Sequence, residues 1–143
     1  MYIKQISVFV VNRPGRLADI TAVLEKENID IRALSVADTT DYGILRLIVS
    51  DPDAALAALK NEGIMASVTE VLGIEVPDAP GGFAKAVRAL ADKDINLEYA
   101  YAFIAPDGKN ACVIVRVENN DEAAAAFKDV GIELLDEKKA FSK

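Results

Sequence analysis

The stretch Asn12-Arg13-Pro14-Gly15-Arg16-Leu17 separates two different hydrophobic patterns. From Ile6 to Val10 apolar side chains alternate, which is typical of a β-strand, whereas from Leu17 to Leu24 they recur at helical spacing. Pro14 can begin a helix, because its φ is fixed and the first helical turn needs no N–H group from it. The stretch therefore predicts a strand, a Pro-Gly turn and a helix over residues 14–28.

The same arrangement occurs again later in the chain. Pro14-Gly15 corresponds to Pro80-Gly81, which lies 66 residues further on, and Gly63 corresponds to Gly131, 68 residues further on. Two additional residues in one turn of the second copy explain the difference. The 143 residues therefore divide into two repeats, which we predict to be domain 1 (residues 1–70) and domain 2 (residues 71–143).

Each repeat has the element order β-α-β-β-α-β. Two right-handed β-α-β crossovers then interleave, which predicts an α+β fold of the ferredoxin-like kind, with an antiparallel sheet of order 4-1-3-2 and both helices on one face. Asn119 and Glu122 resemble a capping box, and Asp51 before Pro52 is a second helix start. The remaining expected elements are strands at 31–36, 44–49, 64–69, 71–76, 96–105, 110–118 and 132–138, helices at 80–93 and 120–130, and hairpin turns at 38–43 and 106–108.

The composition excludes several classes of function. The chain has no histidine and one cysteine, Cys112 in an apolar run, so the Ser/His triad, the Cys/His dyad and the usual zinc ligand sets are absent. A formal net charge of −7 disfavours binding to nucleic acid or to an anionic membrane. No apolar run approaches the ~20 residues that span a bilayer, and the first residues lack the pattern of a signal peptide. We therefore expect a cytoplasmic protein without a metal, a cofactor, a nucleic-acid partner or a membrane partner.

The loop from Asn12 to Leu17, the amphipathic helix after it and the segment Asn28-Ile29-Asp30-Ile31 resemble an ACT domain. The second copy, Asp78-Ala79-Pro80-Gly81-Gly82-Phe83 with Ile95-Asn96-Leu97, is similar but has aspartate at its first position. The resemblance covers nearly the whole chain. It implies a small regulatory module that binds a free amino acid at the interface between paired domains, commonly beside a metabolic enzyme.

The loop also suggests a ligand site on physical grounds. A helix that begins after a Pro-Gly turn presents free N–H groups and a positive dipole, and glycine lets a carboxylate approach the backbone closely. We expect the donors to be the N–H groups of Gly15, Arg16 and Leu17, with Asn12 offering both a donor and an acceptor. The Arg13 and Arg16 side chains either clamp a carboxylate or remain solvated. The matching positions of the second copy are Asp78, Gly81, Gly82 and Phe83.

The resemblance further implies that the ligand contacts the first loop of one domain and a residue eighteen positions later in its neighbour. In this chain the later residues are Asp30 and Asn96. Pairing of unlike repeats then gives one neutral site, Asn12 with Asn96, and one acidic site, Asp78 with Asp30. Pairing of like repeats instead gives Asn12 with Asp30 and Asp78 with Asn96.

We interpret the chain as a non-catalytic amino-acid sensor whose repeats pair through their second strands into an eight-stranded sheet, because those strands are otherwise exposed edges. The pairing occurs either within one chain or in a homodimer. One alternative is a regulatory subunit that docks on an amino-acid biosynthetic enzyme, resembling the small subunit of acetolactate synthase. Another is an enzyme of unknown chemistry. No pair of carboxylates has a spacing that favours acid/base catalysis.

Overall fold

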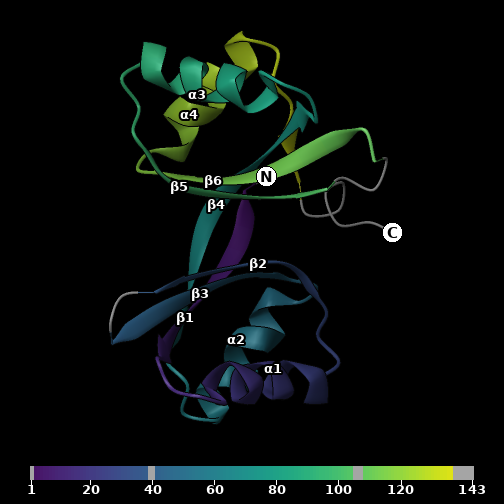
Figure 1. The fold of residues 1–143 in the computed structure, drawn as a ribbon, viewed down its shortest axis with the longest axis vertical. Helices are drawn as coiled ribbons and strands as arrows, with labels where there is room; N and C mark the ends of the chain where they lie inside the picture. Colours follow the sequence, from purple (N-terminus) through teal and green to yellow (C-terminus); the bar gives the residue numbers. More distant parts are fainter. Residues whose placement is uncertain (1, 39–40, 105–107, 137–143) are drawn as a thin grey trace. The chain divides into compact units, whose positions relative to one another are not determined.

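The computed structural model describes residues 2–38, 41–104 and 108–136. Their order of elements follows the expected duplication (Figure 1). The elements are β1 (Ile3–Val11), α1 (Arg16–Lys26), β2 (Ile31–Asp38), β3 (Tyr42–Val49), α2 (Pro52–Asn61), β4 (Ala66–Pro77), α3 (Gly82–Asp92), β5 (Leu97–Ile104), β6 (Asn110–Val117), α4 (Asn120–Asp129) and β7 (Leu134–Leu135).

The chain forms two compact units. We call residues Lys4–Glu70 the N-terminal unit. The C-terminal unit contains the described residues from Val71 onward together with Tyr2 and Ile3. Tyr2 packs against the core of the C-terminal unit, and its hydroxyl donates a hydrogen bond to Asp121. The first residues of the chain therefore lie with the second repeat.

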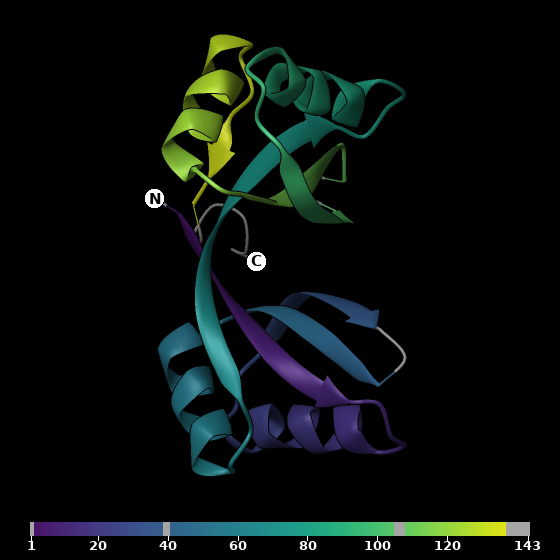
Figure 2. The same cartoon turned by 90° about the vertical axis from the view of Figure 1, so that its left-hand side faces the viewer.

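In the N-terminal unit the strand order is β2-β3-β1-β4, as the 4-1-3-2 prediction requires. β3 is antiparallel to both β1 and β2. Helices α1 and α2 lie on one face of this sheet (Figure 2). The core forms where the helices meet the sheet, because the apolar sides of both helices and alternate residues of the strands point there. Its fully buried members include Ile6, Val8, Ile20, Leu24, Leu45, Leu47 and Leu59.

The C-terminal unit repeats this architecture with the order β7-β4-β6-β5. Helices α3 and α4 cover one face of its sheet (Figure 2). Residues with positive φ recur at matching places, Asn28 with Asp94 and Gly63 with Gly131, so the duplication extends to the backbone conformation. The core includes Leu72, Ile74, Leu90, Val115, Val117 and Phe127.

Strand β4 differs from the expectation. The sequence suggested separate strands at 64–69 and 71–76, but the structure has one strand, Ala66–Pro77. No glycine or proline lies between Ala66 and Leu72, so nothing ends the strand there. The described residues therefore form seven strands instead of eight. Pairing of the second strands into a larger sheet stays a prediction, as does the division into domains 1–70 and 71–143.

The first helix of each repeat begins two residues later than expected. Gly15 and Gly81 have φ of 84° and 86°, which is left-handed backbone, so the helices begin at Arg16 and Gly82, and each proline lies in the turn. The predicted caps of the other helices are confirmed. Asp51 accepts a hydrogen bond from the N–H of Ala54, and Asn119 accepts one from the N–H of Glu122, both at 3.1 Å.

Several smaller expectations have mixed outcomes. The strand expected at 132–138 forms only over Leu134–Leu135, since residues 132, 133 and 136 are described but are not part of it, and residues 137–138 lie outside the described residues. Residues 39–40 and 105–107 of the predicted hairpin turns also lie outside the described residues. Cys112 is buried and forms no disulfide, as its apolar surroundings predict. In the described part of the chain, no helix is long and apolar enough to cross a membrane.

Candidate functional site

The loop between β1 and α1 forms the first candidate site. Its residues Asn12 to Gly15 and Leu17 are exposed, and Arg16 is half-buried. The Gly15 N–H and the Leu17 N–H have no acceptor in the described part of the chain, as expected for donors at a helix start. The Arg16 N–H instead donates to the Arg13 carbonyl at 3.3 Å. The prediction that Arg16 offers a free backbone donor is therefore wrong, because the turn uses that N–H itself.

The loop between β4 and α3 has nearly the same backbone. The Gly82 N–H donates to the Ala79 carbonyl at 3.0 Å, as the Arg16 N–H does to Arg13. Gly82 is buried, and a Cβ built on it would overlap the Pro77 carbonyl oxygen. Glycine at this position is therefore required by the close approach of the backbone rather than by a ligand. Arg16 stands at the matching position of the first loop, so the two loops differ in this respect.

The main-chain anchors of the two loops also correspond. The Asn12 N–H donates to the Asp41 carbonyl at 3.2 Å, and the Asp78 N–H donates to the Lys109 carbonyl at 3.3 Å. These bonds fix the start of each loop on the neighbouring hairpin. The Asn12 and Asp78 side chains are both exposed. The loops thus present similar backbone donors beside a neutral amide in one repeat and a carboxylate in the other.

Asp30 and Asn96 lie just before β2 and β5 and differ in their surroundings. The Asp30 carboxylate lies 3.4 Å from Nε of Arg32, and its main-chain N–H donates to the Ser50 hydroxyl at 3.0 Å. Asn96 is exposed, and its side chain makes no hydrogen bond to the described residues. The Asn96 amide therefore remains available to a ligand, whereas the Asp30 carboxylate already has a cationic neighbour.

In neither unit does the loop lie near the residue eighteen positions later in the same repeat. In the N-terminal unit β3 pairs with Val11 at Tyr42 and with Ile31 at Val49, so the Asn12 loop and Asp30 lie at opposite ends of the sheet. Seven residues of strand separate these ends by about 24 Å. The C-terminal unit repeats the arrangement, since β6 pairs with Pro77 at Asn110 and with Leu97 at Val117. A small ligand that contacts both a loop and a later residue needs a neighbouring unit.

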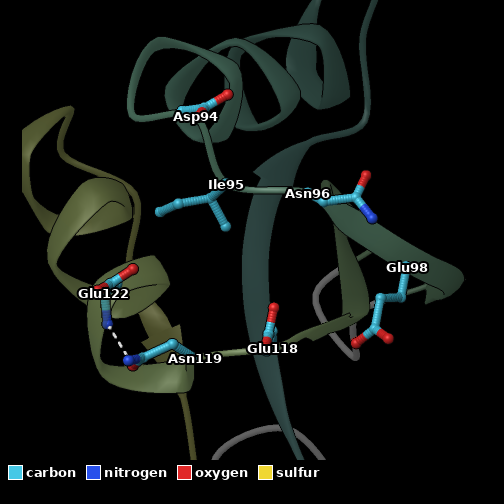
Figure 3. A pocket seen from close by; sticks show the side chains of 7 residues that line it. All are labelled: Asp94, Ile95, Asn96, Glu98, Glu118, Asn119 and Glu122. Carbon is cyan, nitrogen blue, oxygen red and sulfur yellow. Dashed lines mark hydrogen bonds between the residues drawn. The ribbon is translucent and has the colours of Figure 1, made fainter.

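A groove of about 610 Å³ surrounds Asn96 in the C-terminal unit (Figure 3). Sequence analysis missed it, because its walls come from two separate segments that only the fold places together. Figure 3 shows carboxylates from both segments and the apolar side chain of Ile95 between them. Its lining residues are Asp94, Ile95, Asn96, Glu98, Glu118, Asn119 and Glu122. In the described residues, no three or more histidines, cysteines or acidic residues are placed to hold a metal ion.

The groove is more acidic than the matching positions of the first repeat. Its four carboxylates, at Asp94, Glu98, Glu118 and Glu122, correspond there to Asn28, Arg32, Ser50 and Ala54, whereas Asn96 and Asn119 correspond to Asp30 and Asp51. One carboxylate of the groove has a cationic neighbour, since Nε of Arg116 lies 3.7 Å from Glu98. The remaining carboxylates leave the surroundings of Asn96 electrostatically negative, which favours a cationic group over an anionic one. A comparison of the two repeats position by position would have given the only sequence signal for this difference.

Comparison with known proteins supports the resemblance. A family model described as "ACT domain pair" matches residues 1–142. The structure of protein BT0572 from Bacteroides thetaiotaomicron is 40% identical, with a TM-score of 0.92, covering 100% of this chain and 98% of that one. The ligand-free regulatory subunit of aspartate kinase from Thermus thermophilus has the same fold at 18% identity and a TM-score of 0.66, covering 90% and 92% of the two chains. The corresponding subunit from Thermus flavus gives 18% and 0.67, covering 91% of each. No curated protein sequence matches the chain.

Proposed function

Because this chain belongs to the ACT domain pair family, we propose that it is a non-catalytic regulatory protein that binds a free amino acid between paired ACT domains. The observation that carries the proposal is the helix start at Gly15. There the left-handed glycine ends the turn, the N–H groups of Gly15 and Leu17 have no acceptor among the described residues, and no side chain caps the helix. N–H groups without an acceptor at the positive end of a helix suit a carboxylate.

The second half of the proposed site is supplied by a neighbouring unit. Since Asn12 and Asp30 lie at opposite ends of one sheet, the loop needs the later residue of another unit. We assign this role to Asn96, whose side-chain amide can donate to a carboxylate and accept from an ammonium group. Arg13 and Arg16 are the additional side chains that we expect around the carboxylate. Asp78, Gly81, Phe83 and Asp30 form the second, acidic site of the proposal, from which Gly82 is left out because it is buried and its N–H group bonds to the Ala79 carbonyl.

A thermal-shift screen against the twenty amino acids tests this function. A ligand present at 100 times its Kd stabilises the fold by about 2.7 kcal/mol, so a binding amino acid should raise Tm clearly. The amide of the same amino acid, which lacks the carboxylate, is the matched control and should lose the shift. We expect the effector to carry no net negative charge, since carboxylates surround Asn96. Absence of a shift with every amino acid would overturn the proposal.

A second candidate function is that of a regulatory subunit acting on an enzyme of amino-acid metabolism. The observation that favours it is the similarity in fold, over nearly the full length of both chains, to proteins described as regulatory subunits of aspartate kinase. This role is compatible with amino-acid binding. Copurification of a metabolic enzyme whose activity changes on addition of the effector would support it. An effector that binds without altering the activity of any copurified enzyme would support only the sensor function.

A further inference from the structure

The groove around Asn96 lies between two segments that hydrogen bonds join in the first repeat but not in the second. In the first repeat the Asp30 N–H donates to the Ser50 hydroxyl at 3.0 Å, and the Ser50 N–H donates to the Asp30 carbonyl at 2.9 Å. Glu118 stands at the position of Ser50 in the second repeat. The described residues show no hydrogen bond between Asn96 and Glu118. The same fold therefore joins the two segments in one repeat and leaves a groove between them in the other.

The acidic side chains of the groove are only partly explained by the helices beside them. Glu122 lies in the first turn of α4, where the helix dipole favours a carboxylate. Asp94 instead follows the C-terminal end of α3, where the dipole disfavours one. Asn28 has the same left-handed backbone at the matching position without a charge. The turn in which Asp94 lies therefore does not require its carboxylate.

The groove contains more negative charge than its surroundings offset. Nε of Arg116 lies 3.7 Å from the carboxylate of Glu98. Within the described part of the chain, Asp94, Glu118 and Glu122 make no ion pair. The α-ammonium group of an amino acid brings one positive charge to these three carboxylates. The groove therefore favours a ligand with a second cationic group over one with a neutral side chain.

We propose that the amino acid bound at Asn96 has a cationic side chain, as lysine, ornithine and arginine have. The inference rests on the proposed function, which brings the ligand to Asn96. The groove volume of about 610 Å³ lies within the ~300–1,000 Å³ of small-molecule sites, so a long side chain can lie there beside the α-ammonium group. Figure 3 shows Glu98 on the segment that carries Asn96, and Glu118 on the other segment. A ligand that contacts Asn96 therefore meets carboxylates from both segments.

Calorimetric titration of the full chain with matched pairs of amino acids tests the proposal. Lysine and norleucine have side chains with the same number of carbons and differ in the ammonium group, and citrulline is the neutral counterpart of arginine. We expect lysine or arginine to bind about tenfold or more tightly than its neutral counterpart, which is the effect of one charge-assisted contact. Cadaverine, which is lysine without its carboxylate, should bind weakly because the helix-start loop then has no anion to hold. Equal affinities within both pairs would overturn the proposal.

Variants of the groove show whether its carboxylates cause the preference. Glu118→Gln and Asp94→Asn remove a charge and keep the shape of the side chain, and asparagine already occupies the matching position of Asp94, at Asn28. Each variant should reduce the preference for the cationic amino acid and change the affinity for the neutral one little. Glu27→Gln removes an exposed charge at the end of α1 and should leave the preference unchanged. A preference that survives both groove variants would place the cationic group elsewhere and overturn the proposal.

The same titrations separate this proposal from the proposed function. Asn96→Ala should weaken the binding of both members of a pair, because the amide contacts groups that every amino acid has. If a neutral amino acid binds as tightly as its cationic counterpart and Asn96→Ala weakens both, the carboxylates hold only the α-ammonium group. That result would overturn the cationic side chain and retain amino-acid binding at Asn96. Absence of binding by every amino acid would overturn both proposals.

Discussion

The side chain of Ile3 fills the space above the α-carbon of Gly73. A Cβ at Gly73 would lie 2.6 Å from Cδ1 of Ile3, closer than such atoms approach in proteins, and Ile3 is fully buried. Ile3 is the first residue of β1, whereas Gly73 lies in β4, 70 positions later. This contact attaches the beginning of the first repeat to the core of the second, so the two repeats do not fold from wholly separate segments.

We expect Gly73→Ala to destabilise the protein by about 1–3 kcal/mol, because overpacking of a filled core forces side chains away from their preferred rotamers. Urea unfolding measures the change in the free energy of unfolding. Ile3→Val, which removes Cδ1, should cost about 0.5–1.5 kcal/mol alone. The double variant should be less destabilised than the two single changes together, since the added and removed methyl groups occupy the same space. Strict additivity would show that the contact does not constrain Gly73.

Gly82, at the start of α3, faces backbone instead of a side chain. We expect Gly82→Ala to destabilise the protein more than Gly73→Ala, because the Pro77 carbonyl cannot rotate away as a side chain can. Arg16→Ala at the matching position of the first repeat is the control and should have a small effect, since that position already accommodates a Cβ. Equal unfolding free energies for Gly82→Ala and Arg16→Ala would contradict this account of the loop.

Much of the fold can be predicted from the sequence, because the Pro-Gly turns, the hydrophobic periods and the duplication all indicate the same order of strands and helices. The starts of α1 and α3 are an exception. Proline at the first helical position is a sound local rule, but Gly15 takes a left-handed conformation that places Pro14 outside the helix. The continuity of β4 was missed because the repeat boundary suggested a break where the sequence contains no turn residue. Local signals therefore predict the elements better than their ends.

Less of the candidate site than of the fold could be predicted from the sequence. The loop residues were found from the motif, but the bond from the Arg16 N–H to the Arg13 carbonyl depends on a turn geometry that residue types do not specify. The acidic groove joins the segment 94–98 to the segment 118–122, which only tertiary packing brings together. The role of Gly82 likewise depends on the conformation of its loop, which brings its α-carbon against the Pro77 carbonyl. Loop conformations and contacts between separate segments have no direct signal in a single sequence.

We predict that Gly15→Val prevents binding of the effector at the first loop, because a β-branched side chain obstructs the approach of a carboxylate to the backbone donors. The substitution also strains the left-handed backbone, so a matched control is needed. Gly63→Val provides it, since Gly63 has φ of 73° and equally open surroundings but lies after α2. Calorimetric titration should detect binding by Gly63→Val and not by Gly15→Val. Equal binding by both variants would remove the loop from the site.

The last prediction compares the two sites that unlike pairing creates. The first combines Asn12 and Gly15 with Asn96 and has no carboxylate in its loop, since the carboxylates of the groove lie beside Asn96, whereas the second has Asp78 in its loop and Asp30 as its later residue. Two carboxylates oppose the entry of a ligand's own carboxylate. We expect Asn96→Ala to weaken effector binding by about 1–3 kcal/mol through the loss of a hydrogen bond, and Asp30→Asn to change it little.

A gain of binding makes this comparison sharper. The double variant Asp30→Asn/Asp78→Asn gives the second site the neutral residues of the first, so calorimetry should detect an additional binding event per chain. Asp53→Asn/Asp129→Asn removes the same charge from exposed helix positions and should add none, which separates local repulsion from net charge. If like repeats pair instead, each site contains one acid, and Asn96→Ala and Asp30→Ala should have comparable effects. A larger loss from Asp30→Ala would place the primary site at the second loop, because only there does the ligand meet Asp30 beside Asp78.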